Sequence, residues 1–410
     1  MAPSDRRSLA IAMMGTRGVP ARYGGFETAV EEIGRRLVAR GHRVTVYCRA
    51  TDGDTAATPA PIEHLGMRLV TLPALRAKSL ETLTHTAMSS AHAVSHRQDV
   101  VFLFNSANSV FVPLLHARRM PVAVHVDGLE WRRAKWSGAG QRYYRGAESL
   151  AVRWADALIA DAQGIADYYR EEFDASTAVI AYGAPVLRDV PDDRLAELGL
   201  AANRYHLVVA RFEPENHVEM IVAGYRRSSA ELPLVVVGAA PYSDDYTASV
   251  HQTASGDSRI RLLGSVWDQT QLDQLYAHSR VYLHGHSVGG TNPSLLRAMG
   301  AGAAISAYDV GFNREVLGDG CWVFSSASDV ARAVESAEAD CPGSAAYGAA
   351  LRERAAAHYR WDDVAAAYDE LALRLADGWT RRHEASGRRL DAPRWRRDDL
   401  PRTDRNEGMS

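Results

Sequence analysis

Short apolar runs and amphipathic stretches alternate along the first half of the chain. Between residues 27 and 42, Val30, Ile33 and Leu37 recur at helical spacing, and Gly41 ends this pattern. Apolar runs with the length of buried strands lie at residues 8–15, 43–49, 67–74, 99–106, 121–128 and 155–162. A strand, a helix and a second strand in this order predict the βαβ opening of a parallel α/β domain.

A second series of the same kind follows. Residues 177–193 combine one more apolar run with a Pro- and Asp-rich connector. New strand-like runs then lie at residues 205–213, 233–240, 260–266, 280–287, 303–309 and 321–324. We therefore predict an α/β fold of two doubly wound, Rossmann-like domains that face each other, with residues 1–185 in the first and 186–355 in the second.

The end of the chain has a different character. Residues 360–379 carry a helix pattern, whereas residues 379–410 are charged, contain proline and are poor in aliphatic side chains. We expect the tail 379–410 to be disordered, with its mixed charges in solvent.

The composition is that of an ordinary globular protein. Of the 410 residues 46% are hydrophobic and 24% are charged, which suffices for two separate cores. A formal net charge of −3 argues against a nucleic-acid binder, whose binding face needs a basic excess. No apolar run approaches the roughly 20 residues that span a bilayer, so we expect any membrane contact to be peripheral.

Cysteine and histidine patterns support neither a disulfide framework nor a metal site. The 3 cysteines are odd in number and widely spaced, which favours a reducing cytoplasm. The sequence DGD at residues 52–54 is interpreted as a turn, because it lies in a loop rich in Thr, Ala and Pro. His85, His92 and His96 share a helix face without a cysteine or carboxylate at ligand spacing.

The loop after the first strand is rich in glycine and ends at a helix start. Ligands of open parallel sheets bind beyond the carboxyl ends of the strands, and free N–H groups at a helix start favour an anion there. The spacing of Gly15, Gly18, Gly24 and Gly25 is neither that of a dinucleotide fingerprint nor that of a Walker A loop. Taken alone, these glycines are also compatible with a simple tight turn.

A loop of the same design follows the apolar run at residues 280–287. It contains a bend at Gly289 and Gly290, a capping Thr291 or Asn292, Pro293 in the first helical turn and the free amide of Ser294. Two helix starts of this kind in two facing domains predict a nucleoside diphosphate bound in a cleft between them.

Arg211 directly follows a predicted strand in the second domain. Its guanidinium is suited to fork onto phosphate oxygens, and Glu213 or Glu215 is placed to orient it or to cap the next helix. A plain surface ion pair is the competing interpretation.

Titratable residues also follow the strand run at residues 121–128 in the first domain. His125, Asp127 and Glu130 come in succession, and the arginines after them are interleaved with Trp131. Such groups at a strand end suit hydrogen bonding to hydroxylated ligands and proton handling, although they also occur as capping and pairing residues.

These motifs together resemble one enzyme family. From about residue 8 to about residue 378 the chain is similar to family 4-type glycosyltransferases of the GT-B fold, in the branch of bacterial rhamnosyltransferases that assemble surface polysaccharides. The resemblance rests on GTRGVPARYGGFETAVEEIGRRLVARGHRVTVYCR at 15–49, VDGLEWRRAKWS at 126–137, ARFEPEN at 210–216 and HSVGGTNPSLLRAMGAG at 286–302.

The resemblance implies a mechanism and a set of partners. The first domain would bind mainly the acceptor, the second the nucleotide-sugar donor, and a last helix at residues 356–378 would cross back onto the first domain. Transfer of a hexose or deoxyhexose would retain configuration and need no metal or other cofactor, with the leaving diphosphate helping to deprotonate a saccharide, lipid-linked or small-molecule acceptor. The location implied is the cytoplasm, including the inner face of the cell membrane.

The resemblance also assigns residues. The catalytic positions lining the reacting sugar are His125 and Asp127. The residues implied to bind the donor and its phosphates are Gly24, Gly25, Arg211, Gly289, Gly290, Thr291, Asn292, Ser294 and Arg297. Those implied to bind the acceptor are Arg17, Tyr23, Phe26, Glu130 and Trp131. The Arg-, Trp- and Tyr-rich run from Trp131 to Arg145 further suggests an anionic or membrane-surface acceptor.

Two positions depart from the family pattern. Asn216 stands where the family has a lysine, so one phosphate countercharge is missing or supplied elsewhere. Gly289 and Arg297 stand where the family has the glutamates of its E-x₇-E element, and arginine cannot accept hydrogen bonds from ribose hydroxyls. Arg297 is open to three interpretations: it binds a phosphate, it pairs with a nearby carboxylate, or the donor site is impaired.

Three competing functions follow from the same residues. An NAD(P)-dependent oxidoreductase is disfavoured because the glycine fingerprint is absent and Arg49 stands where an acidic residue is expected. A UDP-sugar epimerase of similar architecture would consume donor without acceptor. A non-catalytic or degenerate sugar-nucleotide-binding protein is made plausible by Arg297.

Overall fold

The structure, a computed structural model, describes residues 7–21, 25–50, 61–75, 81–126, 129–133, 138–239 and 244–384. Tyr23, Gly24, Asp127 and the DGD sequence at 52–54 lie outside these residues. The tail 379–410 is described as far as residue 384, and there it contains helix α14 (Arg381–Glu384), so the expectation of disorder is wrong for residues 379–384. None of the helices in the described part is long and apolar enough to cross a bilayer.

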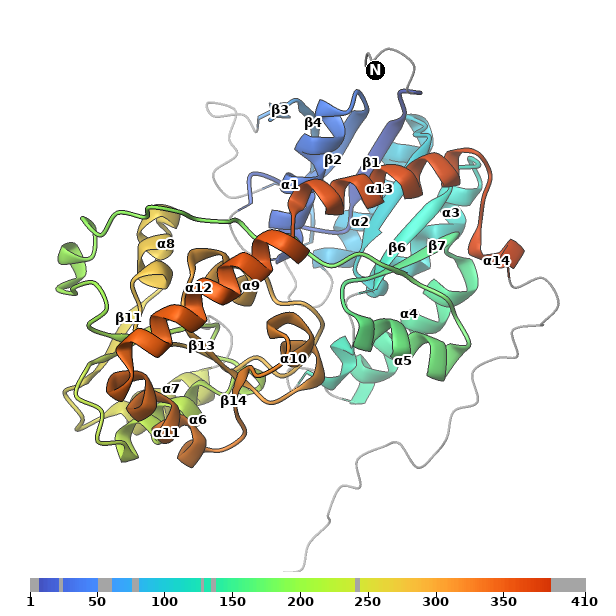
Figure 1. The fold of residues 1–410 in the computed structure, drawn as a ribbon. Helices are drawn as coiled ribbons and strands as arrows, with labels where there is room; N and C mark the ends of the chain where they lie inside the picture. Colours follow the sequence, from blue (N-terminus) through green and yellow to red (C-terminus); the bar gives the residue numbers. More distant parts are fainter. Residues whose placement is uncertain are drawn as a thin grey trace, which may run out of the picture.

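The described residues of the N-terminal half contain an eight-stranded sheet (Figure 1). Its order is β3-β4-β2-β1-β5-β6-β7-β8, and the pairs are parallel except for β3 with β4. The strands are β1 (Ala10–Met14), β2 (Arg43–Arg49), β3 (Glu63–His64), β4 (Met67–Leu72), β5 (Val100–Phe104), β6 (Val122–Val126), β7 (Ala157–Ala160) and β8 (Ala178–Val179). The helices are α1 (Gly25–Ala39), α2 (Glu81–Ser95), α3 (Val112–His116), α4 (Gly138–Trp154) and α5 (Gln163–Phe173), with short 3₁₀ turns η1 (Ser106–Phe111) and η2 (Glu130–Arg132).

Helices cover both faces of this sheet. Ile11 and Met13 of β1 point into a core shared with α1, whereas Ala12 and Met14 belong to the core formed with α2 to α5. Because side chains of a strand alternate between faces, a strand covered on both sides must be apolar throughout, as the run at β1 is. The short strand β3 has no counterpart in the prediction, since two residues carry no periodicity.

The described residues of the second half contain a six-stranded sheet, in the order β11-β10-β9-β12-β13-β14, whose pairs are all parallel. Its strands are β9 (His206–Val209), β10 (Leu234–Val237), β11 (Ile260–Gly264), β12 (Tyr282–His284), β13 (Ile305–Tyr308) and β14 (Trp322–Phe324). Its helices are α6 (Val218–Arg227), α7 (Asp244–Ala254), α8 (Gln269–Ala277), α9 (Pro293–Ala301), α10 (Gly311–Leu317) and α11 (Ala327–Ala339), with η3 (Ala196–Leu198) and η4 (Pro214–Asn216). The predicted α/β fold of two parallel sheets is confirmed.

Two long helices, α12 (Cys341–His358) and α13 (Trp361–Ala376), lead from the second sheet back to the first (Figure 1). Helix α13 packs against α1, and His42 Nε2 lies 2.8 Å from Asp369 Oδ1 of α13. The crossing helix proposed for residues 356–378 therefore covers the end of α12 and all of α13.

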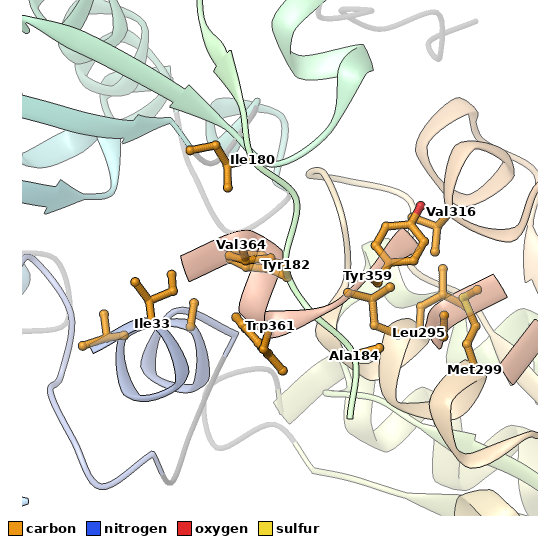
Figure 2. Close-up of a cluster of buried hydrophobic side chains, with 14 of the residues drawn as sticks. Ile33, Ile180, Tyr182, Ala184, Leu295, Met299, Val316, Tyr359, Trp361 and Val364 are labelled. Carbon is orange, nitrogen blue, oxygen red and sulfur yellow. The ribbon is translucent and has the colours of Figure 1, made fainter. Parts of the chain in front are cut away.

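One hydrophobic core continues from the first sheet into the second (Figure 2). Its middle lies where the chain passes twice between the two halves, with Tyr182 and Ala184 on the way out and Trp361 and Val364 on the way back. The Ala184 N–H donates a hydrogen bond to the Tyr359 carbonyl at 2.7 Å. Burial of a large apolar side chain contributes about 1.5–3 kcal/mol, so packing as well as chain connectivity joins the two halves.

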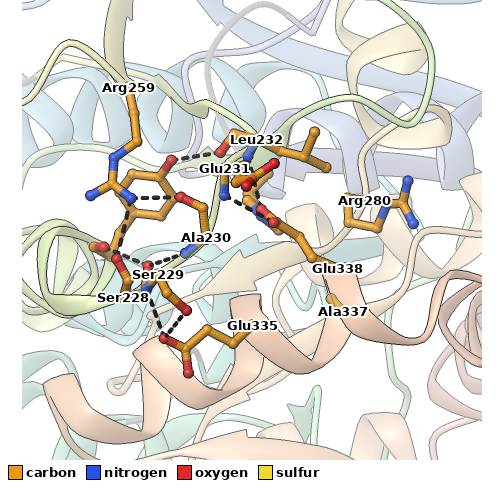
Figure 3. Close-up of polar contacts among 12 residues, drawn as sticks. Ser228, Ser229, Ala230, Glu231, Leu232, Arg259, Arg280, Glu335, Ala337 and Glu338 are labelled. Carbon is orange, nitrogen blue, oxygen red and sulfur yellow. Dashed lines mark hydrogen bonds and ion pairs between the residues drawn. The ribbon is translucent and has the colours of Figure 1, made fainter.

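A dense polar cluster on the second domain serves the fold (Figure 3). It fastens the loop at residues 228–232 to α11, because the Glu338 carboxylate accepts hydrogen bonds from the N–H groups of Glu231 and Leu232, each at 2.9 Å. The same carboxylate lies 2.9 Å from His206 Nε2. The Glu338 carboxylate is thus fully used in holding this loop and His206 to the fold.

Candidate functional site

The N-termini of α1 and α9 meet where the two domains face each other, a region called the domain junction below. Gly25 is the first residue of α1 and Pro293 the first residue of α9. A Cβ atom on Gly25 would lie only 2.6 Å from Pro293 Cγ. The first amides of a helix lack partners within it and carry partial positive charge, so the junction has two sources of attraction for an anion.

A second contact at the junction joins the Gly289–Asn292 turn to Asp161, directly after β7. The Thr291 hydroxyl donates to the Asp161 carbonyl at 2.5 Å. Gly290 approaches the Asp161 carboxylate so closely that a Cβ atom would overlap it. Glycine is therefore required at 290 for packing, and Asp161, which is 4% exposed, helps to position the turn.

His125, near the end of β6, lies inside a cage of aromatic rings. Its ring stacks between Phe104 and Tyr182, with centroids 5.5 and 5.7 Å away, and Phe26 meets it edge-on at 5.3 Å. The side chain is 1% exposed, and neither ring nitrogen has a hydrogen-bond partner among the described residues. Burial lowers the pKa of His125 to about 3. The ring is therefore neutral near pH 7 and offers one donor and one acceptor.

The free energy of unfolding should depend on pH through His125. The pKa is about 3 in the folded protein and about 6.5 in an unfolded chain, so below pH 6.5 the unfolded state binds more protons. The contribution of His125 to the free energy of unfolding should be fully present above pH 6.5. As the pH is lowered toward 3, it should fall by up to about 1.4 kcal/mol per pH unit. Urea denaturation at a series of pH values measures this. The free energy of unfolding of His125→Asn should depend less on pH than that of wild type, whereas the exposed His96→Asn, the matched control, should behave as wild type. Parallel curves for wild type and His125→Asn would contradict this expectation.

Arg211 and Asn216 lie on the second-domain side of the junction. The Arg211 side chain is 57% exposed, with Nη1 3.4 Å from Glu213 Oε1. The Asn216 side chain makes two contacts. Its Nδ2 donates a hydrogen bond to the Arg211 carbonyl at 2.8 Å, and its Oδ1 lies 2.8 Å from His286 Nδ1. Asn216, at the position where the family has a lysine, is therefore an uncharged residue that connects the Arg211 loop to His286 by hydrogen bonds.

His286 presents a hydrogen-bond acceptor to the glycine turn. Because Asn216 Oδ1 is an acceptor, Nδ1 of His286 carries the hydrogen and Nε2 keeps its lone pair. Burial and the nearby Arg133 lower the pKa of His286 well below its usual value, so the ring stays neutral. Gly289 has φ 119°, and a Cβ atom there would lie 3.5 Å from His286 Nε2. The lone pair of Nε2 is thus close to the turn predicted to hold the donor.

Arg133 of the first domain connects acidic residues of both domains. Its Nε lies 2.5 Å from Glu130 Oε2, and its Nη1 lies 3.7 Å from Glu215 Oε1 in the ARFEPEN sequence. Burial and the neighbouring Glu213 carboxylate raise the pKa of Glu215. Glu130, predicted to contact the acceptor, thus holds the arginine that reaches across the junction.

The start of α9 is capped as its sequence predicts. The Asn292 side chain accepts a hydrogen bond from the Ser294 N–H at 2.9 Å, and Pro293 occupies the first helical position. The Ser294 N–H, expected to be free, is therefore occupied by the cap, and the Leu296 N–H donates to the Asn292 carbonyl at 3.1 Å. Because Pro293 has no N–H, the amide left for an incoming anion in this first turn is that of Leu295.

Arg297, one turn further along α9, forms a two-point ion pair with Asp273 on α8. Its Nε and Nη2 donate to Oδ1 and Oδ2 at 2.5 and 2.9 Å, and the two side chains are 23% and 18% exposed. Among the three arrangements considered for this arginine, the structure contains the pairing with a carboxylate. The Nε/Nη2 edge of the guanidinium is therefore occupied by Asp273.

Two predicted acceptor residues lie outside the group around His125. Arg17 is exposed in the loop after β1, and its backbone N–H donates to Glu27 Oε1 at 3.1 Å. The Trp131 ring lies 4.8 Å from the guanidinium carbon of Arg145 on α4. Trp131 thus packs against helix α4 of its own domain and not beside His125.

The sequence did not single out Asp161 or His286. Asp161 directly follows β7 and His286 lies two residues after β12, both at the carboxyl edge of a sheet, where His125 stands within the end of β6. A titratable residue within two positions of the end of a buried strand is therefore the signal that would have identified them.

Comparisons with known proteins cover both halves of the chain. Residues 203–340 match the protein-family model described as "Glycosyl transferases group 1", and residues 9–185 match one described as "Domain of unknown function (DUF1972)". The chain is 25% identical, over 384 residues, to the alpha-maltose-1-phosphate synthase of Mycolicibacterium smegmatis, covering 87% of this chain and 96% of that enzyme. It is 27% identical, over 129 residues, to the O-antigen chain mannosyltransferase B of Escherichia coli, covering 30% of this chain and 34% of that protein.

Solved structures share the fold over most of the chain. A sucrose-phosphate synthase from Thermosynechococcus elongatus has a TM-score of 0.75 at 20% identity, covering 89% of this chain and 98% of that one. Anabaena HepE in complex with UDP-glucose has a TM-score of 0.71 at 17% identity, covering 89% of this chain and all of that one (100%). These relatives do not place the chain in the rhamnosyltransferase branch.

Proposed function

We propose that this chain, a glycosyltransferase of the GT-B fold, transfers a hexose or deoxyhexose from a nucleoside diphosphate sugar to a saccharide, lipid-linked or small-molecule acceptor. The match of residues 203–340 to the model of group 1 glycosyl transferases supports the proposal. The observation that carries the proposal is the meeting of the α1 and α9 N-termini at Gly25 and Pro293, next to the buried neutral His125. This arrangement joins an anion site to a hydrogen-bonding site in one place.

The second domain supplies the donor side in this proposal. The diphosphate lies at the start of α9, where the helix dipole and the Leu295 N–H after the capped Ser294 attract an anion, and the exposed guanidinium of Arg211 supplies a countercharge. The glycine turn at Gly289 and Gly290 lets backbone approach the phosphates and the sugar. His286 Nε2, beside Gly289, is placed to accept a hydrogen bond from a donor hydroxyl.

The first domain supplies the contacts to the transferred sugar and the acceptor. His125 has unpaired ring nitrogens among the described residues and is enclosed by Phe26 and Tyr182, an environment suited to a sugar hydroxyl. We assign the acceptor to the loop around Arg17 and Phe26, and for a lipid-linked acceptor the proposal includes peripheral contact with a membrane surface.

We further propose that transfer retains configuration and needs no metal. The bond between the anomeric carbon and the diphosphate oxygen breaks, the acceptor oxygen bonds to the same face of that carbon, and the acceptor proton passes to the leaving diphosphate. Arg211 and two helix N-termini supply fixed positive charge where negative charge develops on the leaving group, which is the role a metal plays elsewhere.

The choice of sugar is open to direct measurement. The names of the relatives include a mannosyltransferase and a maltose-1-phosphate synthase, and HepE was solved with UDP-glucose. Among deoxyhexoses we propose rhamnose as the candidate, on the resemblance of the motifs. A screen of UDP-, GDP- and dTDP-linked glucose, mannose and rhamnose, with release of nucleoside diphosphate as readout, tests each.

Arg211→Ala should raise the KM for the donor by about 10- to 100-fold, since a hydrogen bond to a charged group contributes about 1.5–3 kcal/mol. Arg227→Ala, at the exposed end of α6, is the matched control and should leave KM unchanged. An unchanged donor KM in Arg211→Ala would contradict the assignment of the diphosphate.

The alternative function is a non-catalytic or degenerate sugar-nucleotide-binding protein. The observation that favours it is the Arg297–Asp273 pair, which stands where the family places a carboxylate for the ribose. Donor binding by calorimetry without nucleotide release, with every sugar and acceptor tried, would support this alternative.

A further inference from the structure

A basic cavity of about 380 Å³ lies on the first domain, between the sheet and the segment that follows α13. Its sheet side consists of residues that precede β5, β6 and β7, which places it at the edge opposite to the domain junction. It is lined by Arg7, Arg97, Asp99, His116, Arg119, Met120, Pro121, Asp156, Leu375, Ala376, Gly378, Trp379, Thr380 and Arg382. We call it the crossover cavity.

The carboxylates in the crossover cavity are already engaged. Asp156 Oδ2 accepts the Val122 N–H at 2.9 Å and lies 2.8 Å from His116 Nε2, while Oδ1 accepts from Arg382 Nη2 at 2.5 Å. These hydrogen bonds outweigh the effect of burial and hold the pKa of Asp156 below its usual value, so it stays ionised. Asp99 Oδ2 accepts the Ala10 N–H at 2.8 Å.

The arginines exceed what these carboxylates neutralise. Arg7 pairs with Asp377 at 2.7 Å and Arg382 with Asp156, but neither Arg97 nor Arg119 has an ion pair or side-chain hydrogen bond with any described residue. Both therefore present a complete guanidinium to the cavity. With Asp377 counted, four arginines face three aspartates, so the cavity keeps an excess of positive charge.

We propose that the crossover cavity binds a phosphate-bearing ligand of the size of a sugar phosphate. Two free guanidinium groups match the geometry of phosphate oxygens, which accept paired hydrogen bonds from arginine. Leu375, Met120 and Trp379 supply apolar surface for the carbon skeleton. The volume lies within the range of about 300–1,000 Å³ that is usual for small-molecule sites.

Occupancy of this cavity would act on the arrangement of the domains. One wall belongs to the first sheet, and the other belongs to the segment after α13, which continues from α12 of the second domain. A ligand bound to both walls stabilises α13 in its position on the first domain. The site is thus a regulatory one, separate from the donor and acceptor.

Thermal unfolding of the full-length protein, at constant ionic strength, tests the proposal with inorganic phosphate and glucose 6-phosphate as probes. Both should raise the Tm saturably, glucose 6-phosphate at lower concentration. The double variant Arg97→Gln/Arg119→Gln should weaken binding of glucose 6-phosphate at least tenfold. Arg118→Gln, which removes a neighbouring exposed arginine outside the cavity, should bind as wild type.

Two further arms identify the source of the phosphate and the site. Vesicles of phosphatidylcholine with 30% phosphatidylglycerol test whether the phosphate belongs to a lipid headgroup. If wild type binds these vesicles and the double variant does not, and glucose 6-phosphate leaves the Tm unchanged, the ligand of the cavity is a lipid phosphate. A response to phosphate that disappears in Arg211→Ala but persists in the double variant places the anion at the domain junction and overturns the proposal. An equal response in wild type and the double variant overturns it as well.

Discussion

Gly25→Val is expected to lower kcat/KM for transfer by at least about 100-fold, because misplacement of reacting groups by about 1 Å costs on that order. Any Cβ atom at this position would lie 2.6 Å from Pro293 Cγ, so the starts of α1 and α9 must move apart. The diphosphate and the sugar would then lose contacts from one side of the junction. Steady-state kinetics with the donor identified by the screen provides the measurement.

The same variant should fold normally. Gly25 does not have a left-handed backbone, its contact is with the other domain, and valine early in a helix costs under about 1 kcal/mol. Gly311→Val is the matched control, since Gly311 is also the first residue of a helix and a Cβ atom there would meet no described atom within 4 Å. Full activity of Gly25→Val would reduce the glycine loop to a simple turn.

Arg297→Glu is expected to destabilise the protein by about 2–4 kcal/mol, since it opposes two carboxylates in a partly buried site. The exchange Arg297→Asp/Asp273→Arg should recover most of this loss, because it restores an ion pair between α8 and α9. Urea denaturation of the single and double variants gives both values. Equal stability of Arg297→Glu and wild type would show that the pair contributes nothing.

The combination Arg297→Glu/Asp273→Asn separates stability from function. It places a carboxylate on α9 without the opposing charge of Asp273, as the family pattern has it. Unchanged transfer would show that the ribose is held by other groups. Transfer that appears in this variant and is absent from wild type would establish the alternative function of a degenerate binding protein.

The strands and the main helices were predictable because the interior of a parallel sheet imposes a local pattern. A strand covered on both faces must be apolar, as at β1 and β10, and an amphipathic helix such as α1 repeats its apolar residues every turn. The glycine turn before α9 and its Asn292 cap were predictable for the same reason, since turn and cap residues act within a few positions of the chain.

What the sequence by itself determined is therefore local: the α/β elements, the two helix starts and the titratable residues after the strands. Only the tertiary structure decided their partners. That Gly25 meets Pro293, that His125 is buried among aromatic rings, that Arg297 pairs with Asp273 and that Asn216 bridges to His286 are all contacts between distant segments. The physical reason is that side-chain charge and pKa depend on burial and neighbours, which the packing of two domains sets and no local pattern encodes.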